Sequence, residues 1–181
     1  IAAVLVQLAD GDERGKINRI KALAATIQNA GAALLLDGHV ELVARSGADG
    51  AHVSGVEPMN AALEQLKPDR IVGVGGLHSR HDSMLAGEAG ADYLLFGEPD
   101  ADGHRPSSEA IAERLEWWAE LFESPCVGYA QTPDEAELFA AAGAFSVRFV
   151  EETAYLTGAR LSCDAASCGV IRVLQGILDA R

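Results

Sequence analysis

The stretch AGADYLLFGEPD, residues 89–100, decides the fold of this chain. A glycine, an alanine and an aspartate precede a run of strand-forming residues, and a second glycine with two carboxylates follows it. Related stretches occur at residues 29–38 (NAGAALLLDG), 45–55 (RSGADGAHVSG) and 141–151 (AAGAFSVRFVE). Each is typical of a helix that stops at a glycine before a tight turn into the next parallel strand. The repetition predicts a chain built from one recurring unit.

Short apolar runs alternate with stretches of helical periodicity along the whole chain. The runs are continuously apolar, which is typical of strands buried on both faces. The predicted strands are residues 2–8, 32–36, 50–53, 70–74, 93–96, 126–129 and 145–149. The predicted helices are residues 16–29, 39–46, 59–66, 79–89, 107–122, 132–142 and 165–180.

Strands that alternate with helices leave two architectures, an open doubly wound sheet and a closed eight-stranded barrel. The recurring unit favours the barrel, in which every strand–helix unit takes an equivalent place. An open sheet would more often carry a glycine-rich loop after its first strand, whereas residues 9–13 read ADGDE. We therefore predict a single α/β domain over residues 1–181, a TIM (β/α)8 barrel. Because the chain opens inside a strand-like run without a methionine, we expect the first strand of the barrel to be missing.

The composition narrows the classes of function. Asp and Glu number 27 against 14 Lys and Arg, which gives a formal net charge of −13, and the sequence contains no basic run. Nucleic-acid binding requires clustered cations that neutralise phosphates, so we expect no nucleic-acid partner. No apolar run approaches the roughly 18 residues of a membrane span, so we expect a cytoplasmic protein without a membrane partner. Three cysteines without C-x-x-C spacing indicate neither a disulfide framework nor a zinc site.

Polar residues at the ends of the predicted strands are the candidates for chemistry, because parallel barrels carry their active sites there. The carboxylates of Asp37, Glu57 and Glu98 could converge on one cavity, where their oxygens would suit Mg²⁺. The alternative for Asp37 is the N-cap of the next helix. His78 follows a glycine pair, and it either acts as a general acid/base in the barrel mouth or only caps a helix.

Further candidates each carry an alternative. Gly76 lets the backbone approach a ligand closely, although a tight turn explains it equally well. Arg105 is the cation of the polar loop after the fifth strand and the candidate for gripping a phosphate, unless it is simply solvated. His52 is either a hydrogen-bonded histidine of the barrel wall or a catalyst. Trp117 and Trp118 lie about a hundred degrees apart on one helix, so one can enter the core while the other meets a neighbouring helix or a partner chain, as in a homodimer.

The order of these stretches resembles the thiamine phosphate synthase family, which also includes a thiazole tautomerase on the same barrel. The resemblance covers most of the chain and is carried by residues 5–13, 33–57, 71–79 and 88–99. The last of these matches the family pattern Glu-Ala-Gly-Ala-Asp-Tyr-x-x-x-Gly-Pro. It implies a TIM-type barrel and a transferase of thiamine biosynthesis that joins a hydroxymethylpyrimidine diphosphate to a thiazole phosphate.

The resemblance also implies roles for single residues. Asp37 matches the family's metal and diphosphate aspartate, and Glu57 falls where the second metal carboxylate belongs, which implies Mg²⁺ as the cofactor. His78 approximates the strand-end histidine and is the implied catalytic residue. The ligand would be a small phosphorylated metabolite, and the implied substrate- and phosphate-binding residues are Gly76, Gly97, Arg105, Gln131 and Arg148.

The chain also departs from the family pattern. Ala9 and Gly11 stand where the family has a diphosphate-gripping arginine and lysine, and Arg105 and Arg148 would compensate only in part. Each lost charge-assisted contact is worth roughly 1.5–3 kcal/mol. Three functions therefore stay open: a divergent thiamine phosphate synthase, a tautomerase-like isomerase that uses His78 as proton shuttle, and a non-catalytic relative that binds a thiamine-pathway metabolite or a protein partner.

Overall fold

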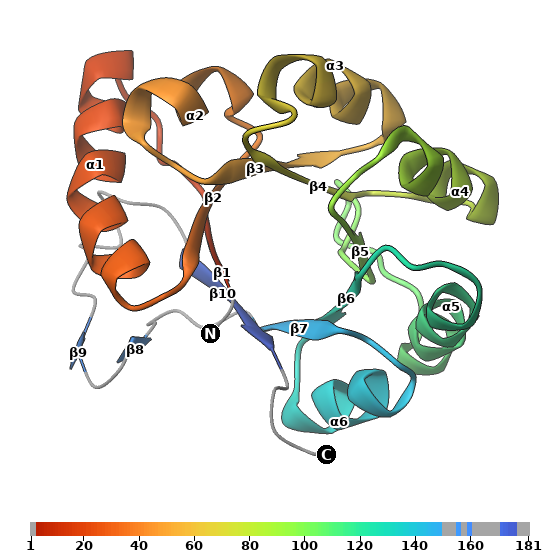
Figure 1. Ribbon diagram of the computed structural model, residues 1–181. Helices are drawn as coiled ribbons and strands as arrows, with labels where there is room; N and C mark the ends of the chain where they lie inside the picture. The colour runs from red at the N-terminus through yellow and green to blue at the C-terminus, as the bar shows by residue number, and fades with distance from the viewer. Residues whose placement is uncertain (1–2, 150–154, 157–158, 161–170, 177–181) are drawn as a thin grey trace.

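Seven parallel strands form a curled sheet with helices around its outside (Figure 1). The computed structural model describes residues 3–149, 155–156, 159–160 and 171–176, and the side chains of residues 3–145. The parallel strands are β1 (Ala3–Val6), β2 (Ala33–Asp37), β3 (Gly50–Ser54), β4 (Ile71–Gly75), β5 (Tyr93–Phe96), β6 (Cys126–Ala130) and β7 (Ser146–Phe149). The helices between them are α1 (Glu13–Asn29), α2 (Val40–Ser46), α3 (Val56–Leu66), α4 (Arg80–Ala89), α5 (Ser108–Leu121) and α6 (Pro133–Ala141).

The ring closes through β10 (Ile171–Gly176), which lies antiparallel between β7 and β1. The prediction of a helix over residues 165–180 is therefore wrong at residues 171–176. These residues satisfy their backbone groups on the open edges of two strands, and that pairing outweighs their helical pattern. An eighth parallel strand ahead of residue 1 stays a prediction, and β10 takes its place between β7 and β1 in the described structure. A separate two-stranded sheet joins β8 (Tyr155–Leu156) to β9 (Ala159–Arg160).

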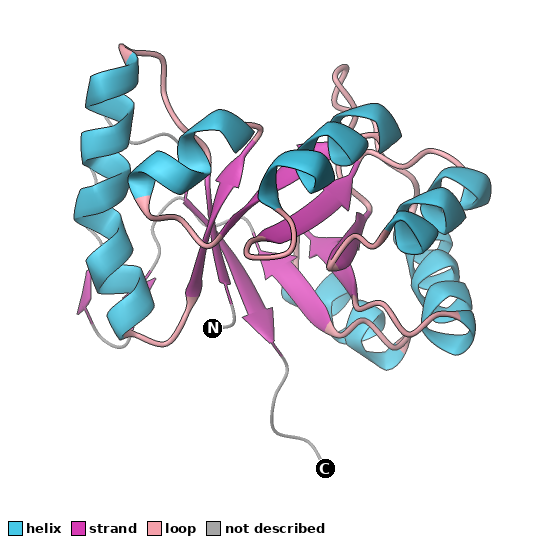
Figure 2. Ribbon diagram, turned by 45° about the horizontal axis from the view of Figure 1, so that its top comes forward, coloured by secondary structure: helices cyan, strands magenta, loops and turns pink. Residues whose placement is uncertain are grey.

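Alternate residues of each strand face two different cores, because successive side chains of a strand point to opposite faces. Inside the ring, Leu5, Leu35, Leu95 and Val127 form a buried cluster with two tyrosines. The residues between them, such as Val4, pack outward against the helices in a larger buried cluster. Figure 2 shows the helices on the outer side of the parallel strands. The strands are thus buried on both faces, as their continuous apolar runs predict.

The repeated Gly-Ala-Asp stretches join neighbouring units to each other. In two copies the aspartate carboxylate accepts a hydrogen bond from a backbone N–H of the preceding strand: Asp49 from Leu34 at 2.8 Å, and Asp92 from Val72 at 2.7 Å. Gly90 ends α4 with a φ of 93°, a left-handed conformation that favours glycine. In residues 89–100, Gly90 therefore ends the helix, and the Asp92 carboxylate then links the start of β5 to the neighbouring β4.

Capping side chains stabilise the first turns of α1, α4, α5 and α6. Ser79 and Asp82 form a complete capping box at the start of α4, because each side chain bonds to the backbone N–H of the other. Thr132 caps α6 in only one direction. Its hydroxyl accepts a hydrogen bond from the Glu135 N–H, but the Glu135 carboxylate contacts other groups.

The two adjacent tryptophans of α5 have different surroundings: one lies in the core and the other contacts a side chain of α4. Trp118 is fully buried and stacks on Phe122 with ring centroids 4.0 Å apart. Trp117 is partly buried and lies under the guanidinium of Arg80, 4.9 Å from the ring centroid. The expectation that one ring enters the core while the other meets a neighbouring helix is therefore confirmed. The homodimer stays a prediction.

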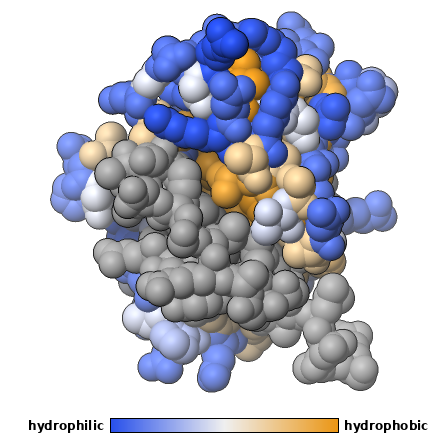
Figure 3. Space-filling model, turned by 90° about the vertical axis from the view of Figure 1, so that its left-hand side faces the viewer, coloured by the Kyte–Doolittle hydropathy of each residue, from blue (hydrophilic) through white to orange (hydrophobic). Residues whose placement is uncertain are grey.

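The outer surface is polar where the described residues of α1 form it. Figure 3 faces this side of the molecule, and mostly hydrophilic side chains lie around a smaller apolar area. The buried residues of α1 are Ile17, Ile20, Ala24 and Ile27, whose spacing of three or four residues makes one inward stripe. Within the described residues, no helix is both long and apolar enough to span a membrane.

Candidate functional site

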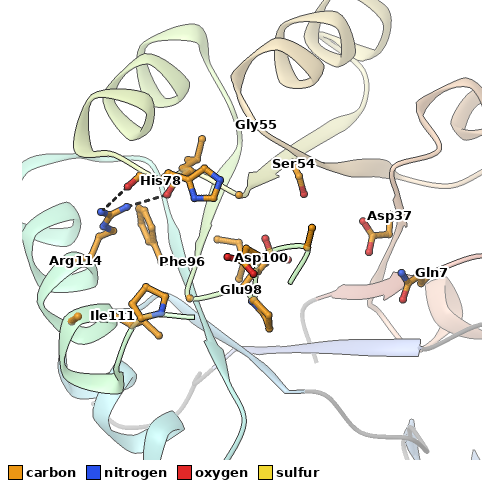
Figure 4. A pocket seen from close by; sticks show the side chains of 18 residues that line it. Gln7, Asp37, Ser54, Gly55, His78, Phe96, Glu98, Asp100, Ile111 and Arg114 are labelled. Carbon is orange, nitrogen blue, oxygen red and sulfur yellow. Dashed lines mark hydrogen bonds between the residues drawn. The ribbon is translucent and has the colours of Figure 1, made fainter. Parts of the chain in front are cut away.

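A pocket of about 770 Å³ opens at the carboxyl ends of the parallel strands. Residues at or just after the carboxyl ends of β1 to β5 line it, together with the loop between β5 and α5 and the first turns of α5. Figure 4 shows Glu98 and Asp100 in the middle of the view, with Asp37 and Gln7 on one side and His78 and Arg114 on the other. The pocket therefore lies at the rim where parallel barrels carry their chemistry.

Asp37 is the last residue of β2, and its carboxylate lines the pocket. The N-cap of the following helix is His39, which makes no side-chain capping bond. The interpretation of Asp37 as a helix cap is therefore wrong. Gln7, directly behind β1, lines the pocket as well. Gln7 was not a candidate from the sequence, because the predicted strand over residues 2–8 includes it.

His78 lies exposed at the rim, in the loop that follows β4. The guanidinium of Arg114, on α5, donates hydrogen bonds to the backbone oxygens of Leu77 at 3.0 Å and His78 at 3.3 Å. Burial, and next the nearby positive charge of Arg80, lower the pKa of Arg114, but a guanidinium stays protonated at neutral pH. Arg114 thus fixes the loop that carries His78, a role for which the sequence held no signal beyond a cation on an amphipathic helix.

Two glycines turn the chain away from its strands at the pocket wall. Gly76 has a φ of 62° and Gly97 a φ of 92°, and both line the pocket. A Cβ at residue 97 would also come within 2.8 Å of the Ile111 side chain. These positions need glycine for backbone conformation and for space, and both bring backbone to the wall of the pocket.

The predicted pair of metal carboxylates is not brought together. Glu57 is exposed in the first turn of α3 and is not among the residues that line the pocket. Glu98 and Asp100 line it beside Asp37 instead. Asp100 also belongs to an exposed group with Asp102 and His104, but its Oδ1 already accepts backbone N–H groups of those two residues at 3.0 and 2.8 Å. That group therefore shapes its own loop.

Arg105 does not reach the pocket, because its guanidinium is engaged elsewhere. It pairs with the carboxylate of Glu135 at 3.0 Å, and it donates to the backbone oxygens of Gly97 at 3.1 Å and Tyr129 at 2.9 Å. Its side chain is only 12% exposed, and that of Glu135 16%. Arg105 thus links three segments as a clamp, namely the loop that follows β5, strand β6 and helix α6. In this position it neither is solvated nor contacts a phosphate site in the pocket.

Glu135 is the centre of this clamp. Burial alone would raise the pKa of its carboxyl group, but hydrogen bonds from the Gln131 N–H, the Ser108 hydroxyl and Arg105 outweigh burial and lower the pKa. Gln131 is exposed and does not line the pocket, and its described contact is this backbone bond. The backbone of Arg148 pairs with Tyr129 in the sheet, whereas its side chain lies outside the described residues.

The pocket lining is acidic. Among the described residues, Asp37, Glu98 and Asp100 place three carboxylates there against the single guanidinium of Arg114, a formal charge of −2 with His78 neutral. Two unit charges 4 Å apart interact by about 4 kcal/mol at the effective dielectric of a protein surface. An anionic ligand would therefore need a bound cation to offset these carboxylates.

A buried polar group lies directly under the pocket. His52 of β3 is 1% exposed, its Nδ1 is 2.9 Å from the hydroxyl of Tyr93, and its Nε2 is 3.7 Å from a carboxylate oxygen of Glu98. The glycines of β4 make room for these groups. A Cβ at Gly73 would overlap the Tyr93 ring, and a Cβ at Gly75 would overlap the Glu98 carboxylate. His52 is thus a hydrogen-bonded histidine of the barrel wall, and it also borders the site.

Comparison with known proteins places this architecture in one family. The sequence profile described as "Thiamine monophosphate synthase" matches residues 1–152. A thiamine-phosphate synthase of Rhodospirillum centenum is 37% identical over 147 residues, which is 80% of this chain and 71% of that protein. One of Erythrobacter litoralis is 37% identical over 121 residues, 62% of this chain. The chain spans only 55% of that second protein.

A solved structure shares the fold. The thiamine phosphate pyrophosphorylase of Pyrococcus furiosus superposes with a TM-score of 0.67 over 81% of this chain and 70% of that chain, at 22% sequence identity. At that identity the likeness concerns the fold, whereas the profile match rests on the sequence itself. Because that match covers most of the chain, this protein belongs to the thiamine monophosphate synthase family.

Proposed function

We propose that this protein is a divergent thiamine phosphate synthase, which joins a hydroxymethylpyrimidine diphosphate to a thiazole phosphate. The observation that carries the proposal is one pocket at the strand ends, in a chain of this family, that gathers Asp37, Gly76, His78 and Gly97. Catalysis at such a site rests on holding two substrates in line and on stabilising the diphosphate that leaves.

Mg²⁺ fits the donor set of the pocket. Magnesium takes oxygen ligands and is commonly held by one or two carboxylates together with substrate phosphates. Asp37 supplies such a carboxylate, and Glu98 and Asp100 add negative charge to the same lining. A bound magnesium ion would offset that charge and stabilise the leaving diphosphate. We assign the metal to Asp37 and not to Glu57, which is exposed and does not line the pocket.

The remaining residues bind and position the substrates. Gly76 and Gly97 offer backbone at the wall, and Arg114 holds the loop of His78 in place. Gln131 and Arg148, expected as phosphate contacts, stay predictions, because neither side chain lies in the described pocket lining. Within residues 3–145, whose side chains are described, the pocket lining has more carboxylates than cations, and this charge supports a metal-dependent and divergent member of the family.

Product formation tests the proposal directly. The chain is incubated with both substrates and Mg²⁺, and thiamine phosphate and diphosphate are measured together. We expect turnover that requires Mg²⁺, and a rate 10- to 150-fold lower in Asp37→Asn, since a charge-assisted contact is worth about 1.5–3 kcal/mol. Glu57→Gln is the matched control and should keep the wild-type rate. Diphosphate that binds without any product would indicate the non-catalytic relative.

A second candidate is an isomerase similar to the thiazole tautomerase of the family, with His78 as the proton shuttle. It is favoured by the exposed His78 at the pocket rim, with its backbone oxygen held by Arg114. Proton exchange on a thiazole carboxylate phosphate, followed in D₂O, would detect it. His78→Ala should abolish that exchange, and unaltered exchange in this variant removes the candidate.

A further inference from the structure

We infer that Arg114 makes one side of the pocket a binding subsite for the anionic group of an organic ligand, a phosphate monoester or a carboxylate. The inference deepens the proposed function, and it rests on that function only in taking this pocket as the ligand site. It concerns which group of a ligand binds beside α5, and not which reaction follows. Three observations carry it.

The first observation is that the charge of Arg114 is not paired. Among residues 3–145, whose side chains are described, no carboxylate forms an ion pair with its guanidinium, and its partners are two backbone oxygens. Arg105, which is also partly buried, pairs with Glu135 instead. Because a partly buried charge is normally paired, Arg114 brings to the pocket lining a positive charge that a ligand can neutralise.

The sequence of α5 explains why Arg114 has no paired carboxylate on its own helix. Side chains three or four residues apart on a helix are neighbours. Four uncharged residues take those positions around Arg114: Ala110, Ile111, Trp117 and Trp118. The adjacent Glu113 pairs with Arg80 of α4. Burial, and next the like charge of Arg80, lower the pKa of Arg114, and only Asp82 opposes them. An anion beside the guanidinium would relieve this repulsion.

The second observation is that Arg114 keeps hydrogen-bond donors for a ligand. Its guanidinium donates to the backbone oxygens of Leu77 at 3.0 Å and His78 at 3.3 Å, and its remaining N–H groups have no acceptor among the described residues. The two bonds hold the guanidinium in place before a ligand arrives, so less conformational entropy is lost on binding. The planar group matches the oxygens of a phosphate or a carboxylate.

The third observation is the apolar wall beside Arg114. The side chains of Leu77, Phe96 and Ile111 are buried and line the same pocket. Figure 4 shows Arg114 next to Phe96 and on the opposite side of the view from Asp37. An apolar wall strengthens an ion pair and offers a surface to the carbon skeleton of a ligand. The pocket therefore has an acidic side that suits a metal ion and a cationic side that suits an organic anion.

Calorimetric titration with three benzyl compounds of different charge tests the inference. The probes are benzyl phosphate, phenylacetate and the neutral dimethyl ester of benzyl phosphate, added to the 181-residue chain without Mg²⁺, so that no metal ion bridges the probe. We expect an anionic probe to bind most tightly, and its affinity to fall about 10- to 50-fold in Arg114→Gln. Tighter binding of benzyl phosphate would identify a phosphate monoester as the occupant, and tighter binding of phenylacetate a carboxylate.

Two comparisons separate charge pairing from support of the loop that Arg114 holds. The neutral ester should bind equally to the wild type and Arg114→Gln, and equal losses for charged and neutral probes would overturn the inference. Arg114→Lys keeps the charge and should recover part of the affinity for the anion, and no recovery would assign Arg114 to the loop alone. Arg80→Gln removes a neighbouring cation outside the pocket lining and is the matched control, which should bind within about 2-fold of the wild type.

The outcomes are distinguishable from those that test the proposed function. Equal affinity of the wild type and Arg114→Gln for both anions would overturn the inference, as would no binding of either anion by the wild type. Each of these results can coexist with formation of thiamine phosphate. Conversely, anion binding that depends on Arg114, without formation of thiamine phosphate, would support the inference and remove the proposed activity.

Discussion

Replacement of Glu135 by glutamine should destabilise the protein while preserving its shape. The Glu135 carboxylate accepts hydrogen bonds from Arg105, the Ser108 hydroxyl and the Gln131 N–H, and its side chain is only 16% exposed. Glutamine keeps one accepting oxygen, but its amide NH₂ group cannot accept. In Glu135→Gln, Arg105 therefore loses its counter-charge while it stays fixed to two backbone oxygens.

The magnitude follows from these contacts. One charge-assisted hydrogen bond is worth about 1.5–3 kcal/mol, and removal of one partner from a fully buried ion pair costs about 3–5 kcal/mol. The Arg105–Glu135 pair is partly exposed, so solvent screening lowers the second figure. We expect Glu135→Gln to lower the free energy of unfolding by about 2–4 kcal/mol at pH 7.

The effect should also depend on pH. Because the folded-state pKa of Glu135 is lowered, its stabilisation is complete above the unfolded pKa, about 4.3, and is lost as the pH falls through the folded value. The difference in stability between wild type and Glu135→Gln should therefore shrink below about pH 4. Urea unfolding at pH 7, 5 and 3.5 would measure it. Glu137→Gln, an exposed residue of the same helix, is the matched control and should change stability by less than about 0.5 kcal/mol.

Two results would refute this reasoning. If Glu135→Gln lost no more stability than Glu137→Gln at pH 7, the clamp would contribute nothing net. If the loss were full at pH 7 but unchanged at pH 3.5, the cause would be packing rather than charge. Either outcome would also remove the argument that Arg105 is held away from the ligand.

Three further predictions concern stability and use urea unfolding. Asp92→Ala should cost about 1–3 kcal/mol, because a strand N–H loses its acceptor. Lys67→Ala removes only a partly exposed ion pair with Asp92 and should cost under about 1 kcal/mol; equal costs would contradict the role of the aspartate. Ser79→Ala should cost about 0.5–2 kcal/mol through the lost capping box, and no loss would contradict it. Gly87→Ala should lower the stability of the wild type, because the new Cβ would lie 2.7 Å from the Trp118 ring. The same substitution should cost less stability in the Trp118→Phe background, and equal losses in both backgrounds would exclude this contact as the cause.

The curled parallel sheet was predictable from local pattern. Continuous apolar runs predict strands buried on both faces, and the glycine stops predict where helices end, so β5 matches its predicted residues 93–96. The exception is β10. Its residues were predicted as a helix, because local periodicity does not reveal that two open strand edges need a partner.

The candidate site was predictable only in part. Strand-end position correctly singled out Asp37, Gly76, His78 and Glu98 as pocket residues, because the ends of parallel strands meet at one rim. Gly97 was expected only from the family resemblance. The same rule failed for Glu57, since the first turn of a helix directs its side chains around the helix axis. Which side chains of that first turn reach the pocket depends on how the helix packs against the sheet.

The sequence alone determined which segments repeat, which residues are buried, and which polar groups follow each strand, since these depend on composition and on periods of two and 3.6 residues. The tertiary structure decided which side chains contact each other between distant segments. Arg105 meets Glu135 thirty residues away, and Glu98 reaches His52 across the space left by Gly75. Charge and shape complementarity between distant segments arises only when the ring brings them together, and no local pattern in the chain records it.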